Sequence, residues 1–571
     1  MKKIILNIII IASLCFSCER DLDLAPVTEV SETTFFKKAS DFEEFANQYY
    51  GSLSGFGTPG LDRQSDIMFG LGTNNISNGS YVTSEESGFW NGSYDRIRQT
   101  TFLLQKYDAL EDASLKTEAV IYAAEARFFR AYAYFNLVKN YGGVPLITQI
   151  LNTTDTEILF KARNSREEVI TQVLTDLDAA ISDLPEQSSY EGGNSDGRIT
   201  KGAALSFKAK VALFEGTWRK YHGGSVGNLL DQAIAASNAV ISSNEYEIFN
   251  HTADFGGSAI DNYKYFFILE QANKTNAANL TKNDNKEFII ERRFDRGREV
   301  GGGIADPRGF SPTSKLANMY LCTDGLPIDK SPLFQGYDLV GDEYINRDSR
   351  MAGIMMVPFE QQWSYRQTVW QRDWSDPMAN GFTNTIEIPG RTTTGYTLHK
   401  LHPEIIGPNG VDYPVLRYAE VLLIFAEATF EKDGSISDAD LNKSINVLRD
   451  RAGIANLTNA LVTNNGLDML TEIRRERTIE LAMEGLRYDD LRRWKTAEIE
   501  LPKAITGIKY AGTQFETDAP WNTLSVTLDA DGFMIVDDVS ARSFDANKHY
   551  LQPLPTNQVE LTEMEQNPGW N

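Results

Sequence analysis

The chain has 571 residues, of which 42% are apolar, and carries 79 Asp and Glu against 55 Lys and Arg, for a formal net charge of −24. A surface this acidic repels nucleic acid and anionic lipid headgroups, so nucleic-acid binding is excluded as a function. The three cysteines are too few for a disulfide framework, and the length allows two to four domains built on buried apolar cores.

The first 17 residues are typical of a secretory signal. A basic start precedes an apolar run from Ile4 to Phe16, which is shorter than the roughly 20 residues that span a bilayer. Ser17 supplies the small residue that precedes a lipidated cysteine, so we expect residues 1–17 to be removed and Cys18 to carry acyl chains. An ordinary secretory peptide is the alternative. A lipidated Cys18 would leave Cys322 as the one free thiol, which we expect to be buried.

Helical periodicity predicts paired helices along the chain. Ser165 and Glu168 form a capping box at the start of one of them. The predicted helices cover residues 117–139, 165–184, 202–221, 229–242, 415–431, 440–452 and 468–495.

Three of these helices contain Ala-x-x-x-Phe, at Ala124 and Phe128, Ala203 and Phe207, and Ala426 and Phe430. A small residue lets a neighbouring helix approach, and the aromatic ring one turn later fills the gap. This is the packing of tetratricopeptide repeats. The spacing between the copies is irregular, which indicates degenerate repeats.

Residues 251–410 are rich in Gly, Pro, Asn and aromatic residues, and the chain has a similar composition after Glu500. Strands are predicted for EFIIERRF and GYTLHKLH, and a hairpin for TLDADGFMIVDD. These segments predict a second, irregular lobe beside the helical core, and its loops are where binding residues are expected.

The densest group of candidate ligand contacts is FEQQWSYRQTVWQRDWSD. Sugar rings present apolar faces surrounded by hydroxyl groups, so a sugar-binding site needs aromatic platforms beside polar side chains. At least one exposed platform is expected here, although any one of these rings could instead belong to the core of the lobe. The candidate residues are Trp363, Tyr365, Arg366, Trp370, Arg372 and Trp374.

A second candidate is the loop GLGTNNISNGSYVTSEESGFW, in which Asn74, Asn75, Asn78 and Tyr81 could reach a ligand. A surface loop without ligand contacts is equally compatible with this composition. Trp521 is a third, weaker candidate.

Short matches to catalytic and metal-binding motifs occur, but the residues around them do not fit the structures that these motifs require. Ser225 lies in GGSVG, but a long predicted helix precedes it where a nucleophile elbow requires a strand. His399 and His402 would lie on opposite faces of a strand, so no zinc site is expected. Asp438 and Asp440 lack the glycine and the closing glutamate of an EF-hand and fit a helix start. No cofactor is expected, with one open possibility: a structural calcium ion held by the acidic turn at Asp529, Asp531, Asp537 and Asp538, where a solvated turn is favoured.

Several separated stretches together resemble the RagB/SusD family of surface lipoproteins, and they occur in the family's order. They are CERDLDLAP, FWNGSYDRIRQTTFLL, EARFFRAYAYFNLVKNYGGVPLI, RITKGAALSFKAKVALFEGTW, PVLRYAEVLLIFAEA, INVLRDRAGI, ERTIELAMEGLRYDDLRRW and HYLQPLPTNQVELTEMEQNPGW. We expect the matching residues to be structural: Trp90, Tyr94, Arg487, Tyr488 and Arg493 should orient and pack helices.

The resemblance implies a mainly α fold, with a tetratricopeptide-like core of four degenerate helix-pair units and an irregular mixed lobe. The expected organisation is a signal at 1–17, helix pairs in 18–250, a ligand-binding lobe in 251–410, and a region at 411–571 that completes the helical core. It also implies a lipid-anchored protein on the cell surface of the outer membrane that captures oligosaccharides for a SusC-like TonB-dependent transporter. Capture of peptides, a lipid-anchored glycoside hydrolase, and a scaffold that binds only proteins are the alternatives.

Overall fold

The computed structural model describes residues 35–190, 195, 197–270, 276–294, 303–304, 309–357, 361–362, 370–371, 393–403, 410–518 and 521–570. Cys18 and the expected signal lie outside these residues.

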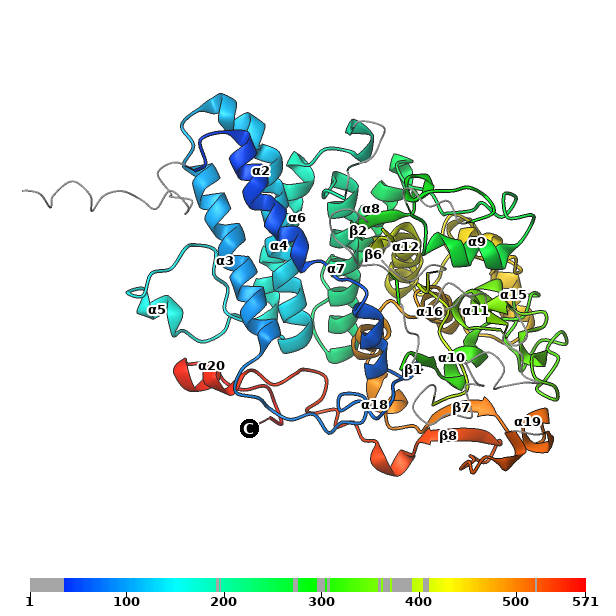
Figure 1. The fold of residues 1–571 in the computed structure, drawn as a ribbon. Helices are drawn as coiled ribbons and strands as arrows, with labels where there is room; N and C mark the ends of the chain where they lie inside the picture. The colour runs from blue at the N-terminus through cyan, green and yellow to red at the C-terminus, as the bar shows by residue number, and fades with distance from the viewer. Residues whose placement is uncertain are drawn as a thin grey trace, which may run out of the picture.

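The longer helices extend across the molecule in Figure 1, from α2, α3, α4 and α6 on the left, through α7 in the centre, to α9 on the right. They are α2 (Ala39–Asn47), α3 (Gly88–Asp108), α4 (Ala113–Tyr141), α6 (Arg166–Asp183), α7 (Lys201–His222), α8 (Leu229–Ser243), α9 (Ala259–Phe266), α12 (Tyr418–Asp433), α14 (Ile445–Ala452) and α16 (Met469–Glu480). The shorter helices are α5 (Thr156–Leu159), α10 (Ser314–Met319), α11 (Ser349–Ile354), α13 (Asp438–Asn442), α15 (Asn459–Asn464), α17 (Arg487–Arg493), α18 (Ala497–Glu500), α19 (Gln514–Thr517) and α20 (Thr556–Leu561). The 3-10 turns are η1 (Gln48–Ser52), η2 (Thr58–Gln64), η3 (Gln187–Ser189), η5 (Lys282–Asp284), η6 (Asp342–Tyr344), η7 (Trp521–Thr523) and η8 (Val539–Ala541).

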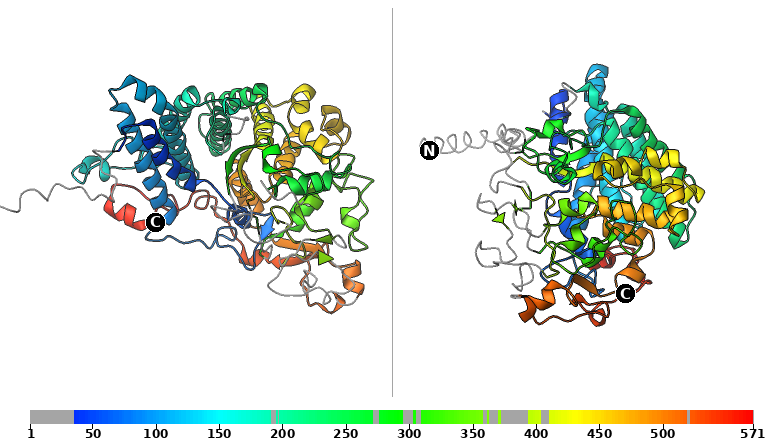
Figure 2. Two further views of the ribbon diagram at one scale, coloured as in Figure 1. Left: turned by 45° about the horizontal axis from the view of Figure 1, so that its top comes forward. Right: turned by 90° about the vertical axis from the view of Figure 1, so that its right-hand side faces the viewer.

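Successive helices pack against one another along the chain. Helix α3 packs on α4, α4 on α6, α6 on α7, α7 on α8, α8 on α12, and α12 on α16. Figure 2 shows this array from two further directions, with the C-terminal segments (orange and red) along one edge of the molecule. The predicted helix-pair core with an irregular mixed lobe is confirmed.

Local sequence determines where these helices begin and end. The side chain of Asp112 accepts hydrogen bonds from the backbone N–H groups of Ser114 and Leu115 at the start of α4, and Gly142 ends this helix with φ +75°. The predicted capping box at the start of α6 is present, since Ser165 and Glu168 each bond the other's backbone N–H.

The Ala-x-x-x-Phe motifs pack as predicted between neighbouring helices. Ala124 and Ala203 are fully buried, and the rings of Phe128 and Phe207 lie 5.4 Å apart between α4 and α7. Burial of such rings removes about 1.5–3 kcal/mol of unfavourable apolar hydration each. The motifs therefore hold the array together at its centre.

The structure corrects three predicted helices. Residues 415–417 belong to strand β6, so the helix predicted from 415 begins at Tyr418. The helix predicted over 440–452 is divided into α13 and α14. The helix predicted over 468–495 is interrupted between α16 and α17, where Met483 and Gly485 have positive φ. A side chain at Gly485 would place its Cβ 2.6 Å from the carbonyl oxygen of Thr58, so close packing accounts for the glycine at this break.

The irregular lobe contains four two-stranded antiparallel sheets within the described residues. The strand predicted for EFIIERRF is confirmed over Phe288–Arg292, which form β2. The segment GYTLHKLH contributes one isolated bridge, Leu398 to Met355, and then turns. The tight turn of the predicted hairpin after Leu528 is present, although its second strand pairs mainly with an earlier one. The pairs are β1 (Met68–Phe69) with β3 (Ser311–Pro312), β2 (Phe288–Arg292) with β6 (Tyr413–Arg417), β4 (Gln361–Gln362) with β5 (Trp370–Gln371), and β7 (Ile505–Lys509) with β8 (Phe533–Asp537).

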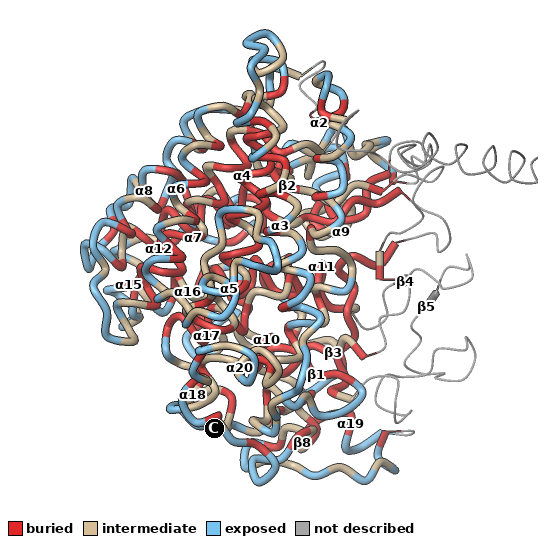
Figure 3. Tube along the Cα trace, turned by 90° about the vertical axis from the view of Figure 1, so that its left-hand side faces the viewer, coloured by how far each residue is buried: buried red, intermediate tan, exposed pale blue. Residues whose placement is uncertain are grey.

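The core of the lobe includes Ile67, Ile479 and Trp521, which lie outside residues 251–410. Buried residues run through both the helical core and the lobe in Figure 3. The domain boundaries at 250 and 410 stay predictions.

A buried network of ion pairs joins the lobe to the helical core. Arg417, at the end of β6, pairs with Glu287 at 2.7 Å, with Glu480 of α16 at 2.6 Å and with Glu484 at 2.8 Å. Lys400, in the lobe, pairs with Glu484 at 2.6 Å. Removing one partner of such a buried pair typically costs about 3–5 kcal/mol, because the remaining charge is left uncompensated. The network therefore fixes the orientation of the lobe.

Candidate ligand-binding site

Two short stretches of the predicted aromatic segment pair as a hairpin. Gln361 pairs with Gln371, and Gln362 pairs with Trp370, in the antiparallel strands β4 and β5. This register places the backbone of Trp370 directly opposite Gln362. The other candidates of this segment, Trp363, Tyr365, Arg366, Arg372 and Trp374, lie outside the described residues, and their contact with a ligand stays a prediction.

The chain on either side of this hairpin is fixed to the lobe. Before it, the N–H of Met356 donates to the carbonyl oxygen of Thr397 at 2.9 Å. After it, the hydroxyl of Thr393 donates to the carbonyl oxygen of Gly70 at 3.0 Å. The segment that carries the hairpin therefore rejoins the described structure beside Gly70, at the end of β1.

Strands β1 and β3 bring two distant loops together at this place. Because Phe69 pairs with Ser311, Gly70 and Phe310 lie at the same end of the two-stranded sheet. Arg63, in the 3-10 turn η2, extends over this end, with its guanidinium carbon 4.5 Å from the centre of the Phe310 ring. We call Arg63, Gly70, Leu71, Gly309 and Phe310 the β1–β3 edge. Sequence reasoning missed Arg63 and Phe310, which are 247 positions apart, because their proximity depends on this pairing.

Two buried aspartates hold η2 in place. Asp62 accepts hydrogen bonds from the backbone N–H groups of Gly485, at 3.1 Å, and Arg487, at 3.2 Å, and burial raises its pKa to about 7. Asp66 pairs with the Arg487 guanidinium through both oxygens, at 2.8 and 2.9 Å, and with Lys315 at 2.7 Å. Burial alone would raise the pKa of Asp66, but the charges of Arg487 and Lys315 hold it well below its usual range. Arg63 is thus presented from a backbone that is clamped on both sides.

The Asn-rich loop leads away from the β1–β3 edge to the C-terminal segment. The side-chain oxygen of Asn74 accepts from the N–H groups of Ile76 and Ser77, at 2.9 and 3.2 Å, which closes a turn. The ring of Tyr81 packs edge-on against Trp570, with 5.9 Å between the centroids.

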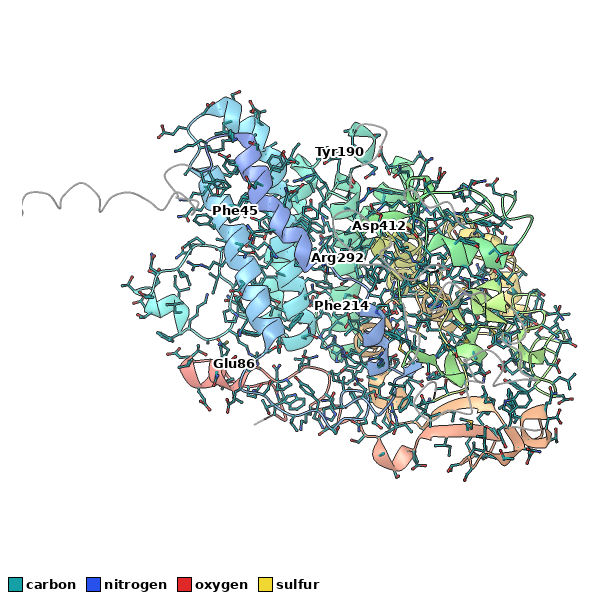
Figure 4. All side chains as sticks on the ribbon, viewed as in Figure 1. Phe45, Glu86, Tyr190, Phe214, Arg292 and Asp412 are labelled. Atoms are coloured by element: carbon teal, nitrogen blue, oxygen red, sulfur yellow. The ribbon has the colours of Figure 1, made fainter. Side chains whose placement is uncertain are left out.

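Asn75 is exposed to solvent, while the carbonyl oxygen of Asn78 accepts from the N–H of Ser543 at 3.0 Å. The loop continues to Glu86, which lies near α20 in Figure 4, far from Arg292 between the helical core and the lobe. Ligand contact by Asn74, Asn75 and Tyr81 stays a prediction.

Trp521 is buried against the ring of Phe515 and contributes to the core of the lobe. The residues expected to pack helices do so: Trp90, Tyr488 and Arg493 are buried, and the hydroxyl of Tyr94 donates to the carbonyl oxygen of Pro145 at 2.9 Å.

The residues singled out for catalysis or metal binding have structural contacts. Ser225 lies in the loop between α7 and α8, and Cys322 is buried. His399 and His402 are buried in a turn, where Nδ1 of His402 lies 2.8 Å from the carbonyl oxygen of Ile304.

The acidic residues considered as calcium ligands also bond locally. Asp438 begins α13, and the Asp529 carboxylate accepts from the N–H groups of Asp531 and Phe533. Across the part of the chain that the structure describes, no three His, Cys, Asp or Glu side chains are grouped to hold a metal ion. The calcium ion stays untested as a possibility.

A concavity of about 490 Å³ lies between the turn around η3, the end of α8, and the start of β2. Its volume falls in the range of small-molecule sites. Acidic and basic side chains are balanced in its lining, which suits a neutral polar ligand. The charged residues of the lining are Glu245, Glu247, Glu291, Lys282, Lys286 and Arg293.

Comparisons with known proteins agree with this fold. The SusD family matches residues 267–570, and a family described as "Starch-binding associating with outer membrane" matches residues 65–213. The SusD-like protein P38 of Formosa agariphila is 23% identical over 89% of this chain and 94% of its own.

Solved structures show the same fold. A SusD-like carbohydrate-binding protein from Bacteroides fragilis superposes with a TM-score of 0.71 and 24% identity, over 93% of this chain and 99% of the other. A laminarin-binding SusD-like protein superposes with a TM-score of 0.57 and 20% identity, over 94% of this chain and all of the other. The family match covers more than half of the chain, and the fold agrees with it throughout: this chain belongs to the SusD family.

Proposed function

We propose that this protein captures oligosaccharides at the cell surface and delivers them to a SusC-like TonB-dependent transporter, without chemical change to the ligand. The proposal is supported by the paired strands β4 and β5, which belong to a sequence segment rich in Trp and polar residues, and by the bond of Thr393, after that segment, to Gly70 of the β1–β3 edge. Aromatic platforms next to polar side chains suit sugar rings. Membership of the SusD family supports the same conclusion, although fold alone does not determine a ligand.

Calorimetric titration of the soluble chain that starts after Cys18 tests the capture step. The ligands are plant, microbial and host oligosaccharides, with a peptide pool beside them. Saturable binding of a glycan that is recovered unchanged supports the proposal. Binding of peptides alone would support peptide capture instead, and a cleaved glycan would support the hydrolase.

Substitutions in the hairpin segment link the binding to its site. Trp370→Ala and Trp374→Ala should each weaken glycan binding about tenfold or more, because truncating a central aromatic contact removes about 2 kcal/mol. The thermal midpoint should stay nearly unchanged. A large loss of stability would show that these rings belong to the core. Trp521→Phe, a substitution in the buried core, is the matched control and should leave binding unchanged.

The delivery step needs a separate experiment. The tagged full-length protein, extracted from the outer membrane in mild detergent, should co-purify with a β-barrel that is identified as a TonB-dependent transporter. Recovery of the lipoprotein without such a barrel would refute delivery while leaving capture intact. The helices that the structure describes include none that is long and apolar enough to cross a membrane. The proposed attachment is through lipid on Cys18.

A further inference from the structure

Arg63 is held at the β1–β3 edge by a backbone carbonyl oxygen and an aromatic ring. Its Nε donates to the carbonyl oxygen of Gly309 at 2.8 Å, and its guanidinium lies over the Phe310 ring at 4.5 Å. The ring face attracts the cation, and the backbone bond fixes the direction of the guanidinium plane. These two contacts use one N–H and one face of the group and leave the terminal nitrogens available.

Gly70 makes room for this arginine, and two further glycines lie in van der Waals contact with it. A Cβ at Gly70 would lie 3.2 Å from Cδ of Arg63, a Cβ at Gly309 would lie 3.6 Å from Nη2, and a Cβ at Gly60 would lie 3.8 Å from Nη1. The backbone therefore approaches the side chain on several sides. Such a cradle lets an arginine sit partly buried with its position set before any ligand arrives.

Arg63 has no carboxylate partner among the described residues. The adjacent acids are engaged elsewhere: Asp62 with backbone N–H groups and Asp66 with Arg487 and Lys315. Partial burial without a neighbouring acid lowers the pKa of the Arg63 guanidinium, although it remains charged at neutral pH. The chain has 79 acidic and 55 basic side chains, and the Arg63 guanidinium is held in position without a carboxylate partner among the described residues. Such a group can bind the anionic group of a ligand.

The surroundings of Arg63 fit a sugar better than a small free anion. Leu71 lies beside Gly309 and is 59% exposed, so it offers apolar surface next to the cation. A sugar that carries an acidic group can pack its C–H face on Leu71 while its anion meets the guanidinium.

We propose that Arg63, supported by Phe310, forms a subsite for the carboxylate or sulfate group of an acidic oligosaccharide. The planar guanidinium provides a fork that matches both anions. This inference rests on the proposed capture of glycans and narrows its ligand to acidic ones. Because the whole protein carries a net charge of −24, which repels acidic glycans, a local cation would favour their binding at this place.

Matched ligand pairs test the subsite in the soluble chain that starts after Cys18. One pair is a uronic-acid tetrasaccharide and its methyl ester, and the other is a sulfated oligosaccharide and its desulfated form. The acidic member of at least one pair should bind the wild-type protein about tenfold or more tightly than its neutral partner, as expected for hydrogen bonds to a charged group. Equal affinity for the acidic and neutral members of both pairs would overturn the inference.

Substitutions assign the preference to this residue. Arg63→Gln should abolish the preference for the acidic ligand while leaving the affinity for the neutral one unchanged. Arg63→Lys should retain part of it, because lysine keeps the charge but lacks the fork. Phe310→Leu keeps Arg63 and should weaken acidic binding less than Arg63→Gln does. Arg98→Gln removes the same charge from an exposed position on α3 and is the matched control. An equal effect of Arg63→Gln and Arg98→Gln would overturn the inference.

The two proposals fail in different ways. If neutral glycans bind and acidic ones do not, capture stands and the Arg63 subsite is refuted. If no glycan of either kind binds, the proposed capture of oligosaccharides fails first. Thermal midpoints of the variants show whether they remain folded, so a loss of binding by an unfolded variant is not misread.

Discussion

Replacing Asp66 with Asn tests how η2 is held against the helical core. Asp66 is 2% exposed and pairs with Arg487 through two bonds, at 2.8 and 2.9 Å, and with Lys315 at 2.7 Å. Asn keeps the shape but removes the charge, which leaves the buried Arg487 guanidinium uncompensated. Such a loss typically costs about 3–5 kcal/mol. We expect the lower end of this range, because Arg487 keeps its bond to the Thr478 hydroxyl and Lys315 keeps Glu500.

The cost of Asp66→Asn should also depend on pH in a defined direction. Because the pKa of Asp66 is lower in the folded protein than in the unfolded chain, its charged form adds stability above about pH 4, the unfolded pKa. This stability is lost as the pH falls below that value. The difference between wild type and Asp66→Asn should therefore be constant from about pH 5 to 8 and shrink below about pH 4.

Urea denaturation of the soluble chain, followed by tryptophan fluorescence and circular dichroism, measures the effect. The variant should unfold at a lower urea concentration with a similar slope. Asp95→Asn, an exposed position on α3, is the control for loss of one negative charge. If Asp66→Asn costs less than about 0.5 kcal/mol, as surface changes do, the reasoning about the clamp is refuted.

Three further predictions concern the lobe, the α16–α17 interruption and the anchor. Burial raises the pKa of Glu343 to about 7, so its contribution to stability is present at low pH and lost as the pH rises from about 4.5 to 7. This loss of stability is worth up to roughly 3 kcal/mol, and Glu343→Gln should reduce it. If the thermal midpoint of the variant falls between pH 5 and pH 8 by as much as that of the wild type, the prediction is contradicted. Gly485→Ala should cost about 1–3 kcal/mol, because its Cβ would meet the carbonyl oxygen of Thr58 at 2.6 Å. Gly466→Ala, also at positive φ but in open space, should cost less, and equal costs would exclude the clash as the cause. Cys18→Ala should release the full-length protein from membranes upon cell fractionation, whereas retention would mean another anchor.

The sequence predicted helices best where local signals act alone. Ser165 and Glu168 define the start of α6 through bonds within one turn, and Gly142 ends α4 because it tolerates positive φ. Helix α3 was not predicted from periodicity, because Gly, Asn and Ser in its first turns dilute the apolar pattern. Its N-cap bond from the Trp90 N–H to the Ser87 hydroxyl oxygen was a readable local signal.

Features that depend on distant contacts could not be predicted. At the interruption after α16, Gly485 lies against the backbone of Thr58, more than 400 residues earlier in the chain. Periodicity alone therefore extended one helix through it. The same reason hid the β1–β3 edge: nothing near Arg63 in the sequence indicates that Phe310 lies beneath its guanidinium.

The arginines that stabilise the fold differ in their contacts from Arg63, the arginine of the proposed subsite. Arg417, Arg487 and Arg493 are buried and each is paired with acids, because an unpaired buried charge would be costly. An excess of acids makes such pairing easy to achieve throughout the chain. Arg63 is held differently, by a ring and a carbonyl oxygen, where no acid reaches it among the described residues. The buried Arg347 is also held by carbonyl oxygens beside a ring, but Arg63 is only partly buried. The partly buried guanidinium of Arg63 therefore keeps terminal N–H groups with which the proposed subsite would bind the anion of a ligand.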